Sequence, residues 1–216
     1  MRGIVFPGAH FSVYQDLPWI DEFVAFIRSA FHEHPHVKLV GICFGHQAIS
    51  TALGGKVERM TDYLEKSGMP LFMGKEELKL KDPKVFLQGL PYTREALSSL
   101  SEDQALTALD PFVLNSVHGD HVAVLPLEIS GRPEFRLEAC SVRTPHELWT
   151  FGDQVLCMQA HPELTAYLMQ RLIIDRLSNL GRLSPEQKAR AETLLHEGPP
   201  LFRHVMLRII ARFLLL

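Results

Sequence analysis

Two short motifs in this sequence carry residues that could perform covalent chemistry together. Cys43 lies in the segment Gly-Ile-Cys-Phe-Gly-His-Gln (41–47), directly after the apolar run 37–40. His161 lies in Gln-Ala-His-Pro-Glu (159–163), which follows a second apolar run far downstream. A thiolate is a nucleophile, an imidazole can serve as its base, and the carboxylate of Glu163 can orient that imidazole. The motifs therefore predict a catalytic Cys-His-Glu group that only folding can assemble.

The residues around the two motifs indicate how the backbone holds them. A strand that ends in Gly-x-Cys-x-Gly and turns at once into a helix exposes its thiol at the carboxyl edge of a sheet, above helix-start N–H groups. That setting favours the thiolate. Pro162 disfavours helical geometry in the preceding residue, so His161 is expected on a loop after a strand. The alternative is a buried core thiol at Cys43 and an ordinary helix-start histidine, and it is weakened because both residues follow apparent strands.

Apolar runs alternate with helical periodicity along most of the chain, which predicts an α/β fold. The run 37–43 shows no alternation of polarity, as is typical of parallel strands covered on both faces. We expect a three-layer α/β/α sandwich around a mostly parallel sheet, forming one domain over 1–216 with a variable, insertion-like region at 60–110. That region is expected to hold loops, a short strand or two and a helix near 93–100. The expected strands are 3–6, 37–43, 112–127, 137–142 and 155–159, and the expected helices are 17–31, 44–53, 163–177, 184–196 and 201–215.

Composition narrows the partners and the compartment. The 216 residues are 46% hydrophobic and 22% charged, enough for one sizeable core. Lys plus Arg is 22 against 25 for Asp plus Glu, so no basic footprint for nucleic acid is present. The three cysteines fit neither a disulfide framework nor a CxxC zinc site, which favours a reducing compartment. With no signal-like start and no apolar run of roughly 20 residues, we expect a cytosolic protein that does not bind membranes.

Four separated motifs, taken in order, resemble those of the class I glutamine amidotransferase family. They are the loop 7–14, the cysteine motif 41–47, the segment 116–122 and the His-Pro-Glu motif 161–163. The resemblance implies a flavodoxin-like α/β/α fold. Members of the family usually have a further strand, helix and strand segment before the Gly8 loop, so the first strand and helix of the fold are expected to be missing here.

The resemblance also assigns roles to the catalytic residues. Cys43, His161 and Glu163 occupy the positions of the family's triad. Cys43 would attack a γ-carboxamide to form a glutamyl thioester, which water then hydrolyses. His161 would protonate the departing amine and activate the water, and Glu163 would hold the imidazole. No metal or organic cofactor is implied.

Further residues are assigned to the oxyanion hole and to substrate binding on the same basis. The backbone N–H of Phe44 and that of Gly8 or Ala9 would meet the oxyanion. Gln47 and the turn His118-Gly119-Asp120 would bind the amino acid end of a small-molecule substrate. The ordinary alternatives are that Gln47 caps a helix and that His118 is a surface turn residue.

Three functions stay open at this level. The first is a stand-alone hydrolase of glutamine or a γ-glutamyl compound. The second is a glutaminase subunit that delivers ammonia to a separate synthase. The third is a truncated, inactive relative with a binding role.

Two other features allow a second interpretation. The histidines of His32-Glu33-His34-Pro35-His36, or those of His118 to His121 with Asp120, could be metal ligands, but a polar linker and a substrate turn explain them more simply. The stripe at Phe202, Val205, Met206, Ile209 and Phe213 predicts a helix that covers a sheet, with membrane-surface binding as the alternative.

Overall fold

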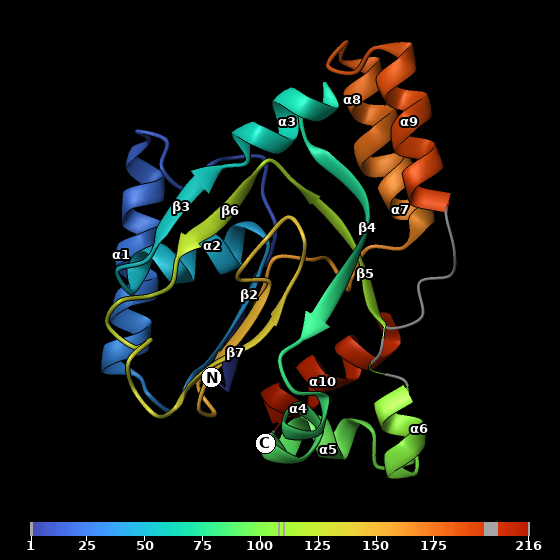
Figure 1. Cartoon of the computed structure of the whole chain (residues 1–216). Helices are drawn as coiled ribbons and strands as arrows, with labels where there is room; N and C mark the ends of the chain where they lie inside the picture. Colours follow the sequence, from blue (N-terminus) through green and yellow to red (C-terminus); the bar gives the residue numbers. More distant parts are fainter. Residues whose placement is uncertain (1, 108, 110, 197–202, 216) are drawn as a thin grey trace.

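The strands form one large mixed sheet and one small sheet in the computed structural model, which describes residues 2–107, 109, 111–196 and 203–215. Within these residues the large sheet has the order β1-β2-β9-β8-β7-β4-β5, and β3 pairs with β6 separately (Figure 1). The strands are β1 Gly3–Phe6, β2 Lys38–Ile42, β3 Lys56–Arg59, β4 Phe72–Leu80, β5 Phe112–His118, β6 Asp120–Val124, β7 Phe135–Cys140, β8 Leu148–Phe151 and β9 Val155–Met158.

Strand direction divides the large sheet into two parts. β2 pairs in parallel with β1 and with β9, whereas β9-β8, β8-β7, β7-β4 and β4-β5 are antiparallel. The prediction of a mostly parallel sheet is therefore wrong, although the α/β class is confirmed. The physical reason is visible at β8, which the sequence did not predict. A short turn joins β8 to β9, and such a turn can only connect antiparallel neighbours.

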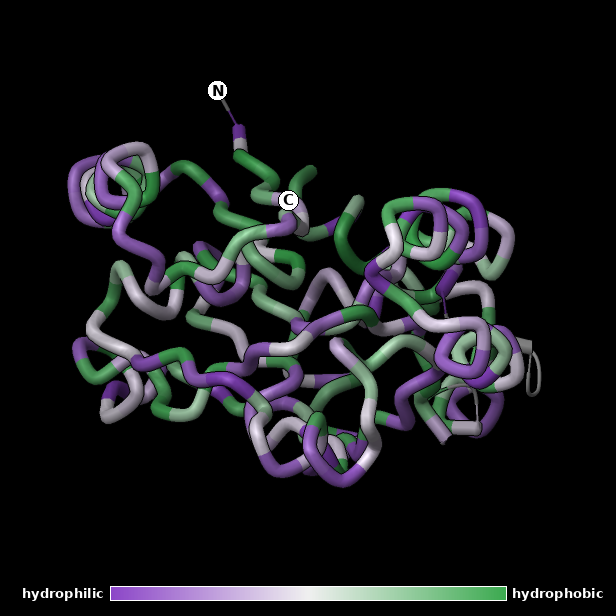
Figure 2. Tube along the Cα trace, turned by 90° about the horizontal axis from the view of Figure 1, so that it is seen from above, coloured by the Kyte–Doolittle hydropathy of each residue, from purple (hydrophilic) through white to green (hydrophobic). Residues whose placement is uncertain are grey.

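Helices cover both faces of the parallel part. On one face lie α1 Pro18–Glu33 and α2 Phe44–Ala52, and on the other lies α10 Arg203–Leu215. Successive side chains of a strand point to opposite faces. Leu39 of β2 therefore packs in the hydrophobic core under α1 and α2, and Val40 packs in the core under α10. Along the outer helices, hydrophobic and hydrophilic residues alternate (Figure 2), as expected of helices with one buried face.

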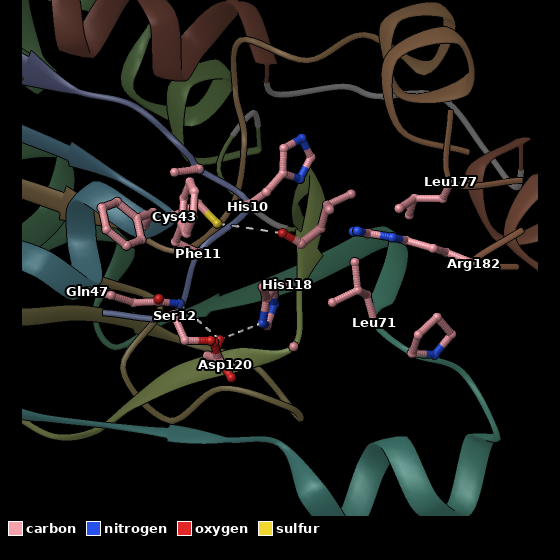
Figure 3. A pocket seen from close by; sticks show the side chains of 15 residues that line it. His10, Phe11, Ser12, Cys43, Gln47, Leu71, His118, Asp120, Leu177 and Arg182 are labelled. Atoms are coloured by element: carbon pink, nitrogen blue, oxygen red, sulfur yellow. Dashed lines mark hydrogen bonds between the residues drawn. The ribbon is translucent and has the colours of Figure 1, made fainter. Parts of the chain in front are cut away.

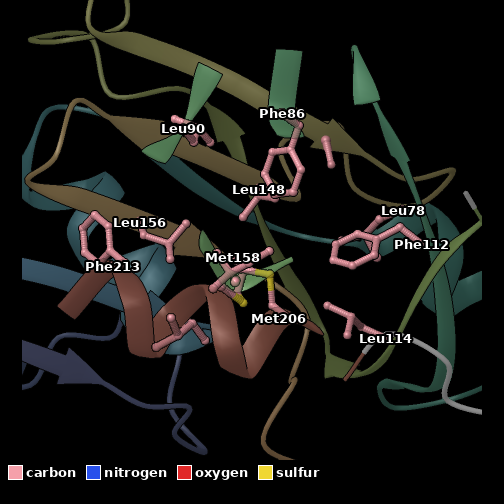
Figure 4. Close-up of a cluster of buried hydrophobic side chains, with 14 of the residues drawn as sticks. Leu78, Phe86, Leu90, Phe112, Leu114, Leu148, Leu156, Met158, Met206 and Phe213 are labelled. Atoms are coloured by element: carbon pink, nitrogen blue, oxygen red, sulfur yellow. The ribbon is translucent and has the colours of Figure 1, made fainter. Parts of the chain in front are cut away.

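The C-terminal helix confirms the prediction of a sheet-covering element. Met206 and Phe213 of α10 are fully buried and point toward Leu156 and Met158 of β9 (Figure 4). Phe202, which was predicted to belong to the same stripe, lies outside the described residues. None of the helices in the described ranges is long and apolar enough to cross a membrane.

The region 60–110 is more regular than predicted. It contains the nine-residue strand β4, which pairs with β5 along most of its length and with β7 only at Lys79 and Leu80. Pro83 and Pro91 do not mark loops, because each stands in the first turn of a short helix, where a missing N–H costs nothing. The helices of this region are α3 Thr61–Ser67, α4 Pro83–Gly89, α5 Pro91–Ala96 and α6 Glu102–Thr107.

Two further predicted elements, a strand and a helix, differ from those in the structure. The predicted strand 112–127 is divided at Gly119 into β5 and β6, which belong to different sheets. The helix predicted from 163 begins only at Ala166, where the side chain of Thr165 caps it. It then continues as α7 Ala166–Met169, the π-helical turn η1 Gln170–Ile174 and α8 Asp175–Asn179, and α9 Pro185–His196 follows. Glu163 consequently lies on a loop.

Candidate active site

Cys43 stands at a strained turn between β2 and α2. Its φ of 52° and ψ of −106° make it the one non-glycine residue with positive φ in the described part of the chain. Such a conformation costs about 1–3 kcal/mol and persists only where the surroundings enforce it. Here the N–H of Cys43 donates to the carbonyl of Met158 at 2.9 Å, and that of Gly45 donates to Pro7 at 3.2 Å. The turn is thus held between two neighbouring strands.

Gly45 explains why the motif needs a glycine after the cysteine. A Cβ at this position would lie 2.0 Å from the carbonyl oxygen of Phe6, far inside van der Waals contact. Only glycine lets the start of α2 approach the end of β1 this closely. The predicted sharp turn at Cys43 is therefore confirmed, together with its cause.

His161 lies beside Cys43 and is held from two sides. Its backbone N–H donates to the carbonyl of Asn115 at 2.7 Å, and its Nδ1 lies 2.6 Å from Oε1 of Glu163. A Cβ on Gly8 would come within 2.7 Å of Cε1 of His161 and 3.6 Å of the Cβ of Cys43. Folding thus brings Cys43, His161 and Glu163 together, with the backbone of Gly8 against them.

The charge state of His161 follows from these neighbours. Burial alone would disfavour the imidazolium, but the charge of Cys43, a hydrogen bond to Cys43 and the bond to Glu163 outweigh it and raise the pKa of His161 to about 10. A cationic imidazole held between a thiolate and a carboxylate is the arrangement that a nucleophilic cysteine needs. The Sγ of Cys43 itself lies 3.6 Å from the carbonyl oxygen of Val117.

A cavity of about 250 Å³ opens in front of Cys43 (Figure 3). Phe44 and Ala9, two of the predicted oxyanion-hole residues, line it, and Phe44 is the first residue of α2, where backbone N–H groups have no intrahelical partner. The full lining is Ala9, His10, Phe11, Ser12, Cys43, Phe44, Gln47, Pro70, Leu71, Val117, His118, Gly119, Asp120, Leu177 and Arg182.

The four predicted substrate-binding residues all line this cavity, but their hydrogen bonds differ from the simplest expectation. Gln47 uses Nε2 to bond the carbonyl of Asp120 and Oε1 of Gln159, each at 3.1 Å, so both amide hydrogens hold the protein. Its carbonyl oxygen is the part left to meet a ligand. Gly119 is the link between β5 and β6 that brings Asp120 back toward Gln47.

His118 and Asp120 have different charge states. Burial lowers the pKa of His118 to about 3, so its ring is neutral, and Nδ1 lies 3.0 Å from the carbonyl of Asp120. The carboxylate of Asp120 accepts hydrogen bonds from the hydroxyls of Ser12 and Tyr14, which ties the loop after β1 to this turn. Asp120 is therefore the anionic group at this end of the cavity.

Sequence reasoning missed several lining residues. Leu71 and Leu177 carry no motif, and neither does Arg182, which reaches the cavity from the loop after α8. Gly181 was the one available signal, since a glycine after an apolar helical stretch indicates where a helix ends. Nothing in the sequence shows that this helix end faces Cys43.

The alternative metal ligands do not gather. His32 bonds Glu128 at 3.2 Å, and the rings of His34 and His36 lie edge to face at 6.0 Å. Across the residues that the structure describes, no group of three or more His, Cys, Asp or Glu side chains is placed to hold a metal ion.

The fold and the thiol at a strand-to-helix turn define an α/β protein with its reactive residues at the carboxyl ends of strands. The family model described as "Glutamine amidotransferase class-I" matches residues 1–178. The chain therefore belongs to the class I glutamine amidotransferase family.

Curated proteins that are similar to this chain include γ-glutamyl peptidases and GMP synthases. γ-Glutamyl peptidase 3 of Arabidopsis thaliana is 26% identical over 92% of this chain and 68% of its own length. A GMP synthase (glutamine-hydrolyzing) of Clostridium kluyveri is 41% identical, but over 34% of this chain and 14% of its own length. The chain thus spans about two thirds of the γ-glutamyl peptidases it matches and a small part of the synthases.

Solved structures share the fold. A glutamine amidotransferase from Thermotoga maritima has a TM-score of 0.59 at 20% identity, covering 97% of this chain and 78% of the other. A glutamine amidotransferase from Methylobacillus flagellatus has a TM-score of 0.53 at 20% identity, covering 94% and 73%. At these identities the likeness establishes the fold alone.

Proposed function

We propose that the protein is a cysteine-dependent hydrolase that cleaves the γ-amide of glutamine or of a γ-glutamyl compound. The observation that carries the proposal is the cluster of Cys43, His161 and Glu163, in which Cys43 lines the cavity and a cationic imidazole lies beside its thiol. Membership in the class I glutamine amidotransferase family supports it, and so does the match to a protein named γ-glutamyl peptidase.

The reaction divides into two steps. In the first, the thiolate of Cys43 attacks the γ-carbonyl carbon, the C–N bond breaks, and the departing amine takes the proton of the His161 imidazolium. In the second, His161 accepts a proton from water, which attacks the thioester. The C–S bond then breaks, glutamate leaves and the thiolate is restored. Glu163 keeps the imidazole oriented through both steps.

The oxyanion and the amino acid end of the substrate meet separate groups. The N–H of Phe44 and that of Gly8 or Ala9 would stabilise the tetrahedral oxyanion, a contribution of roughly 3 kcal/mol for each donor. At the other side of the thiol, the carboxylate of Asp120 would attract the α-ammonium group, and the amide oxygen of Gln47 would accept a hydrogen bond from it.

A glutaminase that feeds ammonia to a separate synthase is the second candidate. The local match to GMP synthases favours it, since those proteins are named as glutamine-hydrolyzing. A stable complex with a synthase, in which a low basal turnover of glutamine rises on binding, would distinguish this role from that of a stand-alone peptidase.

The test measures glutamate released by the purified chain from glutamine and from a γ-glutamyl dipeptide. Wild type and Cys140→Ala should release glutamate, and Cys43→Ala should not. Cys140 is a suitable control because it is a free, partly exposed thiol outside the cavity. Release that survives in Cys43→Ala, or no release from either compound by folded wild type, would contradict the proposal.

A further inference from the structure

The cavity has two chemically different ends with Cys43 between them. Ser12, Gln47 and Asp120 form a polar, anionic end. The opposite end is apolar, with Leu71 and Leu177, and carries one cationic side chain, that of Arg182 (Figure 3). A substrate whose reacting carbonyl lies at Cys43 must place its two sides toward these two ends.

Arg182 is positioned by the motif that terminates α8. Gly181 adopts a φ of 66°, its N–H donates to the carbonyl of Ser178 at 2.9 Å, and the N–H of Arg182 donates to that of Leu177 at 2.8 Å. These bonds form a Schellman motif, which sets the residue after the glycine beside the third-last helical residue. The motif therefore fixes the backbone of Arg182 next to Leu177, and both side chains line the cavity.

The guanidinium of Arg182 is free to meet a ligand. Its stem runs past Leu177 toward the centre of the cavity (Figure 3). Within the described residues the side chain of Arg182 has neither an ion pair nor a hydrogen bond. By contrast, the side chain of Arg171, in η1 of the same helical stretch, pairs with Asp175. An unpaired guanidinium beside apolar walls is suited to a carboxylate, which it can bind through two parallel hydrogen bonds.

The position of Arg182 indicates which part of the substrate carries that carboxylate. If the α-ammonium of the glutamyl group lies near Asp120, the group on the far side of the scissile amide extends toward Arg182. Ammonia, the leaving group of glutamine, has no carboxylate that a guanidinium could bind. An amino acid or a short peptide offers a carboxylate, and an apolar side chain on it would contact Leu71 and Leu177.

We propose that Arg182 binds the free carboxylate of the departing amine, so that the substrates of this site are γ-glutamyl amino acids or γ-glutamyl peptides rather than glutamine. The inference rests on the proposed function and names the substrate class of the same site. Arg182 is a specificity-determining residue in this account and takes no part in bond making.

The test compares substrates that differ only in the carboxylate. γ-Glutamyl-leucine and γ-glutamyl-leucyl-glycine are each assayed beside the form whose terminal carboxylate is converted to a carboxamide, and glutamine is assayed as well. In wild type the free carboxylate should give the higher kcat/KM. In Arg182→Gln this preference should fall about tenfold through KM, and Arg182→Lys should retain part of it, because the charge stays and the paired hydrogen bonds do not.

Arg176→Gln is the matched control, since Arg176 is an exposed arginine of α8 that does not line the cavity. It should leave the preference as in wild type. A preference that is absent in wild type, or that Arg182→Gln and Arg176→Gln change equally, would overturn the inference. An equal loss with glutamine would overturn it too, because Arg182 would then bind the glutamyl end.

A binding measurement separates this inference from the proposed function. Calorimetry with Cys43→Ala, which needs no turnover, should show γ-glutamyl-leucyl-glycine binding more tightly than its carboxamide, and Arg182→Gln in the same background should remove the difference. If wild type hydrolyses none of the compounds, the proposed function fails, and calorimetry still decides the role of Arg182. No binding, or equal binding of both forms, would overturn it.

Discussion

The two parts of the large sheet make different contributions to the protein. In the parallel part, β2 and β9 each lead directly into a reactive residue, Cys43 or the His161 loop, and both strands are covered by helices on both faces. In the antiparallel part, Leu71 directly precedes β4 and His118 ends β5, and both residues line the cavity. In the proposed function, the first part therefore holds the reacting groups and the second part forms the cavity wall that the substrate meets.

The buried charges show the same division. Beside β2 and β9, the charged imidazole of His161 lies between Cys43, which lines the cavity, and Glu163. The antiparallel part buries the carboxyl groups of Glu76 and Glu147 away from it, with Arg143 bonded to Glu76. We expect substitutions in the first group to change chemistry and substitutions in the second to change stability.

The largest expected effect is that of His161→Ala. Removing the base should lower kcat/KM by about 10⁴-fold or more, because members of a catalytic group act as a unit. The melting temperature is measured alongside, so that loss of fold is not mistaken for loss of chemistry. His36→Ala, at an exposed histidine of the α1–β2 linker, is the control and should be fully active. Comparable losses of kcat/KM in both variants would show that His161 has no special role in the chemistry.

Gly45→Ala tests the rigidity of the parallel part. Its Cβ would lie 2.0 Å from the carbonyl of Phe6, so the free energy of unfolding should fall by roughly 3 kcal/mol or more. Gly131→Ala is the matched change, since no heavy atom lies within 4 Å of the added Cβ and its backbone is not in the left-handed region. It should change stability by less than about 0.5 kcal/mol. Urea unfolding measures both, and similar stabilities would show that β1 and α2 are not packed as described.

Glu147 links the stability of the antiparallel part to pH. Burial, and then the nearby carboxylate of Glu76, raise the pKa of Glu147 to about 8, against 4.5 when it is unperturbed. The folded state therefore favours the protonated acid. Its contribution is complete below pH 4.5 and is lost as pH rises through 8, a change of up to a few kcal/mol.

Glu147→Gln, which mimics the protonated acid, should remove this part of the pH dependence. Urea unfolding between about pH 4.5 and 8.5, which brackets the two pKa values, should show wild type losing more stability than the variant, while glutamate release per folded molecule stays equal. Parallel stability curves for the two proteins would contradict the account.

A smaller effect is expected from Glu163→Gln on the pH profile. Activity should decline on the alkaline side as the His161 imidazolium loses its proton, near pH 10 in wild type. Glu163 is one of the groups that raise this pKa, so its removal should move the decline to lower pH. The pH dependence of kcat/KM measures the shift. A decline at unchanged or higher pH would show that Glu163 does not stabilise the charged ring.

The features of the fold and the site that could be predicted from the sequence are those that neighbouring residues in the chain determine. The glycines around Cys43 and the proline after His161 are signals within a few residues, so short motifs were enough to predict the turn and the loop. The bonds that hold the turn come from Met158 and Pro7 and are not part of the cysteine motif. The direction of β8 is not local, because Leu148–Phe151 are buried on both faces and would look the same in a parallel strand. Pro83 and Pro91 are ambiguous in the sequence, because a first helical turn and a loop both accept a proline.

Arg182 shows the limit most clearly. Its backbone geometry is local and could be predicted from Gly181. Its place in the cavity depends on how η1 and α8 pack, through Ile174 and Leu177, against Met69 and Met73. Such packing between distant segments leaves no periodic signal in the chain.

The most direct test of the central claim is to treat the protein with a diazo-ketone analogue of glutamine and to map the adduct by mass spectrometry. We predict labelling at Cys43, strongly reduced in His161→Ala and protected by a γ-glutamyl peptide. Labelling spread equally over Cys43, Cys140 and Cys157, or labelling of Cys43 that does not depend on His161, would contradict the account.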